Sequence, residues 1–232
     1  MRARALGVAT TFAVLIGAIV VYWVYFLTSG PSAISATVNR DGSANLTLQV
    51  VPAYGHHPFP DWVSYLAKDS SGRWRHTTIY KVPPHTIVHV TIYQYDSQTG
   101  LRNPFFGQIR GTVGGVARYT DVGNTGKGSG LPLYDDTAES VLPPGSAAHT
   151  FTDPDLGLNV PLVGISDAAT NTCSAAPCAT SFAHTMIQFS FRTPGPGSYR
   201  WQCIVPCALG FLDGFGGPMQ TIGYMDGLIV VT

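Results

Sequence analysis

The sequence predicts an all-β sandwich with Greek-key connections, preceded by one transmembrane helix. Gly and Pro account for 26 and 17 of the 232 residues, which is typical of many short strands joined by turns. Short runs alternate between apolar and polar residues, and no helical period follows residue 27. A long apolar run occurs at the N-terminus, and it predicts the helix.

Residues 1–30 are predicted to form a membrane anchor. The run "ALGVATTFAVLIGAIVVYWVYFL" (5–27) is uncharged, and a helix of this length spans a bilayer core of roughly 30 Å. Arg2 and Arg4 precede the run, and no Lys or Arg follows it until Arg40. This bias predicts a cytoplasmic N-terminus and an extracytoplasmic main domain. A cleaved signal peptide, ending within "PSAISA" (31–36), is the alternative.

Residues 34–232 are predicted to form one β-domain. Strands are expected in 34–52 around the turn "NRDGS", in 87–93, in 147–165, in 184–203 around the turn "TPGPGS", and in the closing "MDGLIVVT". The Gly-rich segment 97–147 is long for a loop in a compact domain. We expect it to be an insertion that forms a hairpin of its own or covers a surface.

Two of the four cysteines, Cys173 and Cys178, lie in the small-residue segment "NTCSAAPCATS". An extracytoplasmic location permits disulfides, so a disulfide that closes this loop is predicted, with metal binding as the alternative.

The other two cysteines lie in "WQCIVPCALGFLDGFGGPMQTIGYM" (201–225), which also holds two of the four methionines and no histidine. Thiolate and thioether sulfurs are soft donors, which points to copper first. Upstream, His149 opens the segment "HTFTDPDLGLNVPL". A lone histidine before a β-type run is as often a hydrogen-bonded core residue as a ligand.

These segments together resemble the cupredoxin superfamily, and within it the copper domain of cytochrome c oxidase subunit II. The resemblance rests on "HTFTDPDLGLNVPL", the strand "GSYRWQC" and the C-x3-C spacing, and it covers 149–165 and 186–232. A single N-terminal anchor before an exported β-domain is similar too. The resemblance implies a copper site with His149 as the first imidazole, Cys203 and Cys207 as thiolates, and Val205 as a carbonyl donor.

The chain departs from the family pattern after the second cysteine. The family has His four residues and Met seven residues further on, where this chain has Phe211 and Gly214. Met219 or Met225 is therefore expected to return to the site, and Met219 completes the predicted metal-ligand set.

Three outcomes remain open for this altered site. The set of His149, Cys203, Cys207 and a methionine would favour Cu(I) because its donors are soft. An electron-transfer site could recruit the missing imidazole from His184, or from the pair at 56–57. In the third outcome the fold has no metal, and the two cysteines are oxidised to each other.

The remaining titratable residues indicate a site only weakly. The histidines at 56–57 are interpreted as a solvated pair, and those at 85 and 89 would share one strand face. An acidic set surrounds His149 in sequence and could steer a basic electron carrier, although a solvated loop is the simpler interpretation. It comprises Asp135, Asp136, Glu139, Asp153 and Asp155.

A net charge of zero without a basic run argues against nucleic-acid binding, and no hydrolase or nucleotide-binding motif occurs. The sequence predicts a membrane-anchored protein, similar to oxidase subunit II, that binds copper for electron transfer or copper handling at a respiratory membrane. Its expected partners are the bilayer and other membrane-complex subunits or a redox carrier protein. It is not expected to be an enzyme alone. The alternative is a metal-free accessory subunit of a membrane complex.

Overall fold

The structure is a computed structural model that describes residues 2–23, 31–55, 61–123, 132–207 and 217–232. The chain divides into two compact units, Met1–Pro31 and Ser32–Thr232. The first unit contains helix α1 (Arg2–Tyr22). Within the described residues, no helix combines the length and the apolar character that crossing a membrane requires. The transmembrane role of this segment stays a prediction.

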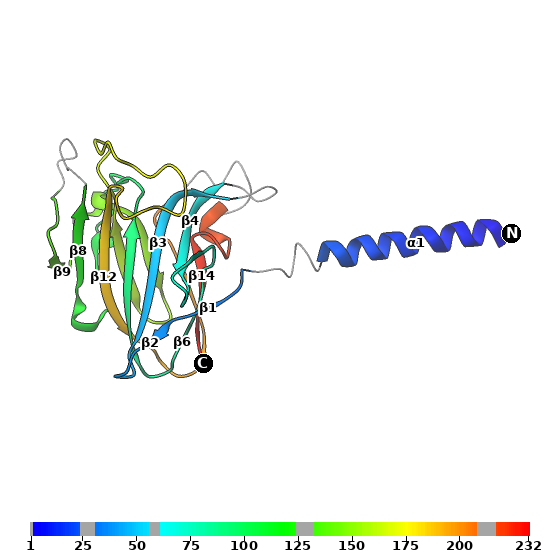
Figure 1. The fold of residues 1–232 in the computed structure, drawn as a ribbon, viewed down its shortest axis with the longest axis horizontal. Coiled ribbons are helices and arrows are strands. Elements are labelled where there is room, and N and C mark those ends of the chain that lie inside the picture. Colours follow the sequence, from blue (N-terminus) through cyan, green and yellow to red (C-terminus); the bar gives the residue numbers. More distant parts are fainter. Residues whose placement is uncertain (1, 24–30, 56–60, 124–131, 208–216) are drawn as a thin grey trace. The chain divides into compact units, whose positions relative to one another are not determined.

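The second unit is a sandwich of two β-sheets, as predicted. Figure 1 shows β9, β8 and β12 in this order across the larger sheet, with β3 further along, and β7 lies between β12 and β3. Strand β3 runs parallel to β7, and β12 pairs antiparallel with both β7 and β8. In spatial order the larger sheet contains β5 (Trp74–Arg75), β4 (Trp62–Lys68), β3 (Ala44–Tyr54), β7 (Ile87–Gln94), β12 (His184–Arg192), β8 (Ala117–Val122) and β9 (Thr137–Glu139), with β2 (Thr37–Val38) paired to β3.

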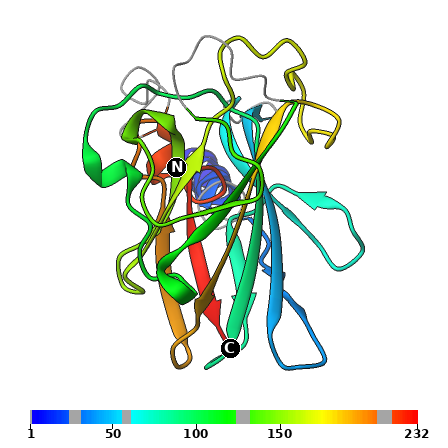
Figure 2. The same ribbon diagram turned by 90° about the vertical axis from the view of Figure 1, so that its left-hand side faces the viewer.

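The smaller sheet carries most of the segments that the resemblance covers. Figure 2 shows its strands β13 and β14, in orange and red, in one layer and the blue strand β3 in the other. In spatial order it contains β1 (Ile34–Ser35), β6 (Ile79–Val82), β14 (Asp226–Val231), β13 (Gly197–Gln202), β10 (Ala147–Asp153) and β11 (Leu158–Val163). Every residue of β10 and β11 is buried.

The core between the sheets is aromatic close to the predicted site. The Trp201 ring stacks on Phe151 at 4.6 Å and on Tyr80 at 5.6 Å, and Tyr65 meets it edge-on at 4.7 Å. All four side chains are fully buried, so they fix the positions of the strands that carry them. Because Trp201 lies two residues before Cys203, this packing also fixes where the chain leaves β13.

The Gly-rich segment 97–147 contains a hairpin, which is one of the two structures expected for it. Its strands β8 and β9 pair with each other, and β8 also pairs with β12, so the hairpin extends the larger sheet. The rest of the segment contributes short 3-10 turns, η2 (Pro104–Gly107), η3 (Val113–Gly115) and η4 (Pro144–Ser146).

The disulfide between Cys173 and Cys178 is confirmed. It packs on the larger sheet against Val51, Leu66 and Tyr95, in a cluster separate from the main core. The amide of the buried Gln49 holds this loop in place, because it accepts from Cys178 N at 2.8 Å and donates to Cys178 O at 3.3 Å.

Candidate metal centre

The pairing of β10 with β13 brings His149 to the two cysteines. Thr152 pairs with Gln202, and the strands are antiparallel. Continuing this register by two residues places Thr150 opposite Ile204, and the Thr150 hydroxyl accepts a hydrogen bond from Ile204 N at 3.0 Å. One residue further, His149 comes opposite Val205, which is midway between Cys203 and Cys207.

Three donor atoms converge at this point. His149 Nδ1 lies 2.9 Å from Cys207 Sγ and 3.8 Å from Cys203 Sγ, and the two sulfurs are 2.9 Å apart. All three side chains are buried, and their donor atoms lie within 4.8 Å of one another. The two thiols are not joined in a disulfide. Two thiolates and one imidazole that face a common point can bind a soft metal ion.

The Val205 carbonyl and a methionine lie beside this group. Cys207 Sγ donates to Val205 O at 2.9 Å, and Cys203 Sγ donates to the same oxygen at 3.4 Å. Met219, in the 3-10 turn η5 (Gly217–Gln220), accepts a hydrogen bond from Cys207 N on its Sδ at 3.3 Å. Met225 acts through its backbone instead, since its carbonyl accepts from Cys203 N at 2.8 Å.

The other ring nitrogen of His149 contacts a residue that sequence reasoning missed. Nε2 lies 3.0 Å from Asp96 Oδ2, and Ser97 N donates to Asp96 Oδ1 at 2.8 Å. A sequence signal for Asp96 exists in the alternation of β7. Every second residue of that strand faces the core, ending with Gln94. Asp96 is two residues after Gln94, so the same alternation would have predicted that its carboxylate is directed toward the opposite sheet.

The group is electrostatically coupled. Burial by itself would lower the pKa of His149, but hydrogen bonds to Asp96 and to cysteine sulfur raise it to about 9. Burial would raise the pKa of Asp96, yet the hydrogen bond with His149 lowers it. Hydrogen bonds from Cys207 and His149 outweigh burial and place the pKa of Cys203 well below its usual value. Burial and the neighbouring Cys203 raise that of Cys207. Cys203 is therefore the more acidic of the two thiols.

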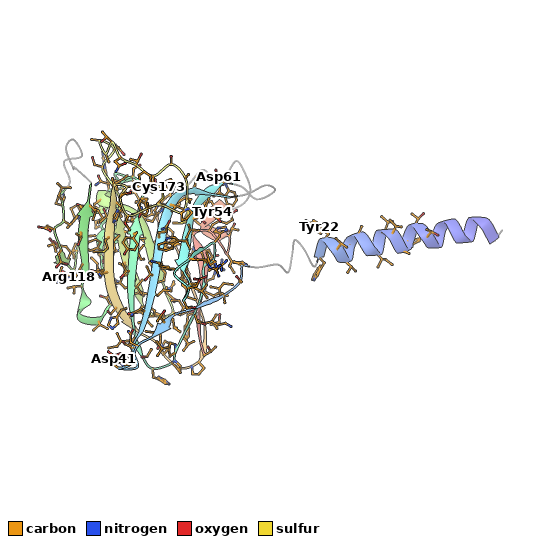
Figure 3. All side chains as sticks on the ribbon, viewed as in Figure 1. Tyr22, Asp41, Tyr54, Asp61, Arg118 and Cys173 are labelled. Atoms are coloured by element: carbon orange, nitrogen blue, oxygen red, sulfur yellow. A yellow bond between two sulfur atoms is a disulfide. The ribbon has the colours of Figure 1, made fainter. Side chains whose placement is uncertain are left out.

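A hollow of about 280 Å³ reaches the group from one side. His149, Cys207, Asp96 and Asp61 are among its lining residues. Figure 3 labels Asp61 at the same end of the sandwich as Cys173, opposite the end that holds Asp41. The hollow gives small species a route to Cys207, whose residue surface is only 3% exposed.

The structure does not bring His184 into the donor group. Its Nδ1 lies 2.7 Å from Phe182 O, and its ring contacts Tyr93 and Tyr95. Tyr93 and Tyr95 belong to the cluster around the disulfide on the larger sheet. Burial lowers the pKa of His184, so this imidazole stays neutral at physiological pH.

The other histidines lie outside the donor group or outside the described residues. His85 precedes β7 and has a φ of 53°, so the prediction that it shares a strand face with His89 is wrong. The turn before the strand breaks the alternation that the prediction assumed. His89 Nδ1 instead lies 2.8 Å from Ser190 Oγ. His56, His57, Phe211 and Gly214 lie outside the described residues.

The acidic set near His149 in sequence does not form one patch. Asp136 pairs with Arg118 at 2.8 Å on the surface, whereas Asp153 is fully buried at the end of β10. The carboxylate next to the imidazole is instead that of Asp96, two residues after β7.

No family model matches the chain, and no curated protein matches it. Among solved structures, it is similar to the copper protein rusticyanin, at 16% identity over 85% of this chain and 86% of that one, with a TM-score of 0.32. The rusticyanin from Thiobacillus ferrooxidans shows 15% identity over 88% and 86%, with a TM-score of 0.31. A chain of a heme-copper terminal oxidase dimer shows 12% identity over 99% and 97%, also with a TM-score of 0.31.

Proposed function

We propose that this protein binds one copper ion, preferentially as Cu(I), through His149, Cys203 and Cys207, with the Met219 thioether as a weak fourth donor. The observation that carries the proposal is the convergence of three donor atoms within 4.8 Å. These residues come from β10 and from the connection after β13, which are far apart in the sequence.

The donor types favour copper over other ions. The group contains two sulfurs and one imidazole nitrogen, and such soft donors select Cu(I) over hard cations such as Mg²⁺ or Ca²⁺. The second imidazole that a blue-copper site uses is absent from the group formed by the described residues. A set rich in thiolate stabilises the monovalent ion, so the bound copper is expected to have no visible absorption until it is oxidised.

The hollow favours copper handling over electron transfer alone. A protein that receives or delivers copper needs a route by which other ligands approach the ion, and the hollow reaches both His149 and Cys207. Electron transfer would instead be served by a closed site. In either role, the protein would act as an extracytoplasmic partner of a respiratory membrane complex, similar to oxidase subunit II.

We also propose that the N-terminal segment anchors the protein in a membrane, with the β-domain outside the cytoplasm. The support is the uncharged run at residues 5–27 together with the arginines that precede it. Residues 24–27 of this run lie outside the described part of the chain. The anchor predicts that the full chain resists extraction from membranes by alkaline carbonate. Release by carbonate into the soluble fraction would contradict it.

The decisive experiment measures copper in the purified full-length protein. Reduced protein is loaded with Cu(I), freed of excess metal and assayed for copper per chain and for affinity in competition with a Cu(I) chelator. We expect one ion per chain, and we expect Cys203→Ser and His149→Ala to lose it. His89→Ala is the matched control, because it removes an exposed imidazole bonded to Ser190.

The same measurement separates the second candidate, a metal-free accessory subunit. The close approach of the two sulfurs, at 2.9 Å, favours that reading, since oxidation could join them. Copper well below one ion per chain in fully reduced protein would refute the copper proposal and leave the accessory role. Loading that survives Cys203→Ser would show that the metal is held elsewhere.

A further inference from the structure

We infer that Asp96 is a positioning residue for the metal centre: its carboxylate holds the His149 ring so that Nδ1 faces the two cysteine sulfurs. The inference rests on the proposed copper site and adds to it a residue that is not itself a ligand. The contact between Asp96 and His149 links the segment just after β7, in the larger sheet, to β10 in the smaller one.

The hydrogen bonds around Asp96 define the arrangement. Ser97 N donates to Oδ1 at 2.8 Å, and Ile165 N donates to the Asp96 carbonyl at 2.9 Å. Both the backbone and one carboxylate oxygen are therefore fixed. The other oxygen, Oδ2, lies 3.0 Å from His149 Nε2.

This contact decides which ring nitrogen is free for a metal. An ionised carboxylate can only accept hydrogen bonds, so the proton between Asp96 and the imidazole resides on Nε2. The carboxylate therefore occupies Nε2, and Nδ1, which lies 2.9 Å from Cys207 Sγ, is the nitrogen left to bind a metal once the metal displaces any proton from it. A carboxylate that accepts from the non-ligating nitrogen fixes both the tautomer and the orientation of a metal-binding histidine.

The opposite ring orientation would not serve the site. A ring flipped about its χ2 axis would lose the bond to Asp96 and would direct a carbon atom toward the sulfurs. Because the His149 side chain is only 4% exposed, the loss of this hydrogen bond would leave a largely buried ring without its carboxylate partner. The contact with Asp96 therefore favours the ring orientation in which Nδ1 faces the sulfurs.

The test compares Asp96→Ala and Asp96→Asn with Asp61→Asn. Asp61 is the matched control: it lines the same hollow and carries the same charge. Among the described residues, however, no hydrogen bond joins it to His149. We expect Asp96→Ala to weaken Cu(I) binding by about 10- to 100-fold, as the loss of a residue that orients a ligand does. Asp96→Asn keeps an oxygen acceptor and should retain part of the affinity, whereas Asp61→Asn should bind like the wild type.

A second readout does not need copper. In the metal-free protein, the Nε2–H proton of His149 is buried and hydrogen-bonded, so its NMR resonance should be visible because exchange with water is slow. We expect this resonance to disappear in Asp96→Ala, and to remain in Asp61→Asn and Asp96→Asn. Thermal unfolding of each variant checks that the domain is intact.

Equal losses of affinity in Asp96→Ala and Asp61→Asn would overturn the inference, because they would show an effect of hollow charge alone. Survival of the Nε2–H resonance in Asp96→Ala would overturn it as well. If the wild type shows the Asp96-dependent resonance but binds no copper, the proposed function fails while the orienting contact stands.

Discussion

Replacement of Asp153 by asparagine should stabilise the protein at neutral pH and not at acidic pH. Asp153 ends β10, the strand that carries His149, and its side chain is fully buried. Oδ1 accepts hydrogen bonds from Asp155 N and Leu156 N, while Oδ2 is buried without a partner in the described part of the chain. Burial of the charge, with a contribution from Asp155, raises the pKa of Asp153 to about 6.

The direction and size of this pH dependence follow from the linkage between proton binding and folding. The folded state binds the proton more tightly than the unfolded state, whose pKa is near 3.8, so the stability that this carboxyl contributes is complete below pH 3.8 and is lost as the pH rises through 6. Two pKa units correspond to about 3 kcal/mol at 1.36 kcal/mol per unit. The D153N variant has no such proton, and the cost of burying its amide is independent of pH.

The assay is denaturant unfolding of the full chain at pH 4, 5, 6, 7 and 8, followed by tryptophan fluorescence. The free energy of unfolding of D153N minus that of the wild type should rise by about 2–3 kcal/mol between pH 4 and pH 8. D155N, an exposed neighbour, should change stability by less than about 0.5 kcal/mol throughout. A D153N difference that stays flat, or falls as the pH rises, would refute the electrostatic reasoning.

Four further substitutions, one of them a control, test the site and the packing around it. Met219→Leu should weaken Cu(I) binding by about tenfold, worth about 1.4 kcal/mol, whereas Met225→Leu should not; both changes conserve volume, and equal effects would exclude Met219 as the fourth donor. Cys173→Ala should lower the free energy of unfolding by about 2 kcal/mol, because it opens a short loop, and should leave copper stoichiometry unchanged. Copper loss in that variant would contradict the separation of the two cysteine pairs. Gly227→Ala should destabilise by at least about 2 kcal/mol in denaturant unfolding, since its Cβ would lie 2.0 Å from Thr78 O; wild-type stability would show that the backbone yields there.

Individual strands were predictable because their sequence signals are local. Alternation marked β7 and β12, and the turn "TPGPGS" marked the break before β13. The pairing of β7 with both β3 and β12 was not predictable, because the alternation in a strand does not identify its neighbours. For the same reason, the sequence did not decide whether the segment 97–147 forms a hairpin or covers a surface. Its strand β8 is determined by the edge of β12 that it joins, which is far away in the sequence.

The residues of the candidate site also differ in how far the sequence could predict them. His149, Cys203 and Cys207 could be proposed from the sequence because they match the motif of the family that the chain resembles. The structure adds the reason why they meet, since one antiparallel pairing sets the imidazole opposite the residue midway between the two cysteines. Asp96 was missed because the alternation of β7 indicates only which face Asp96 shares, whereas its contact with His149 depends on how the two sheets pack. Met219 comes from a 3-10 turn beyond the strand, so its approach depends on the conformation of a connection and not on register. In the proposed centre, His149 from β10 and the two cysteines that follow β13 would supply the soft donors, and Met219 would add the fourth. Substitutions at Met219 should consequently alter metal affinity without unfolding the domain, whereas changes in β10 or β13 should affect stability and metal binding together.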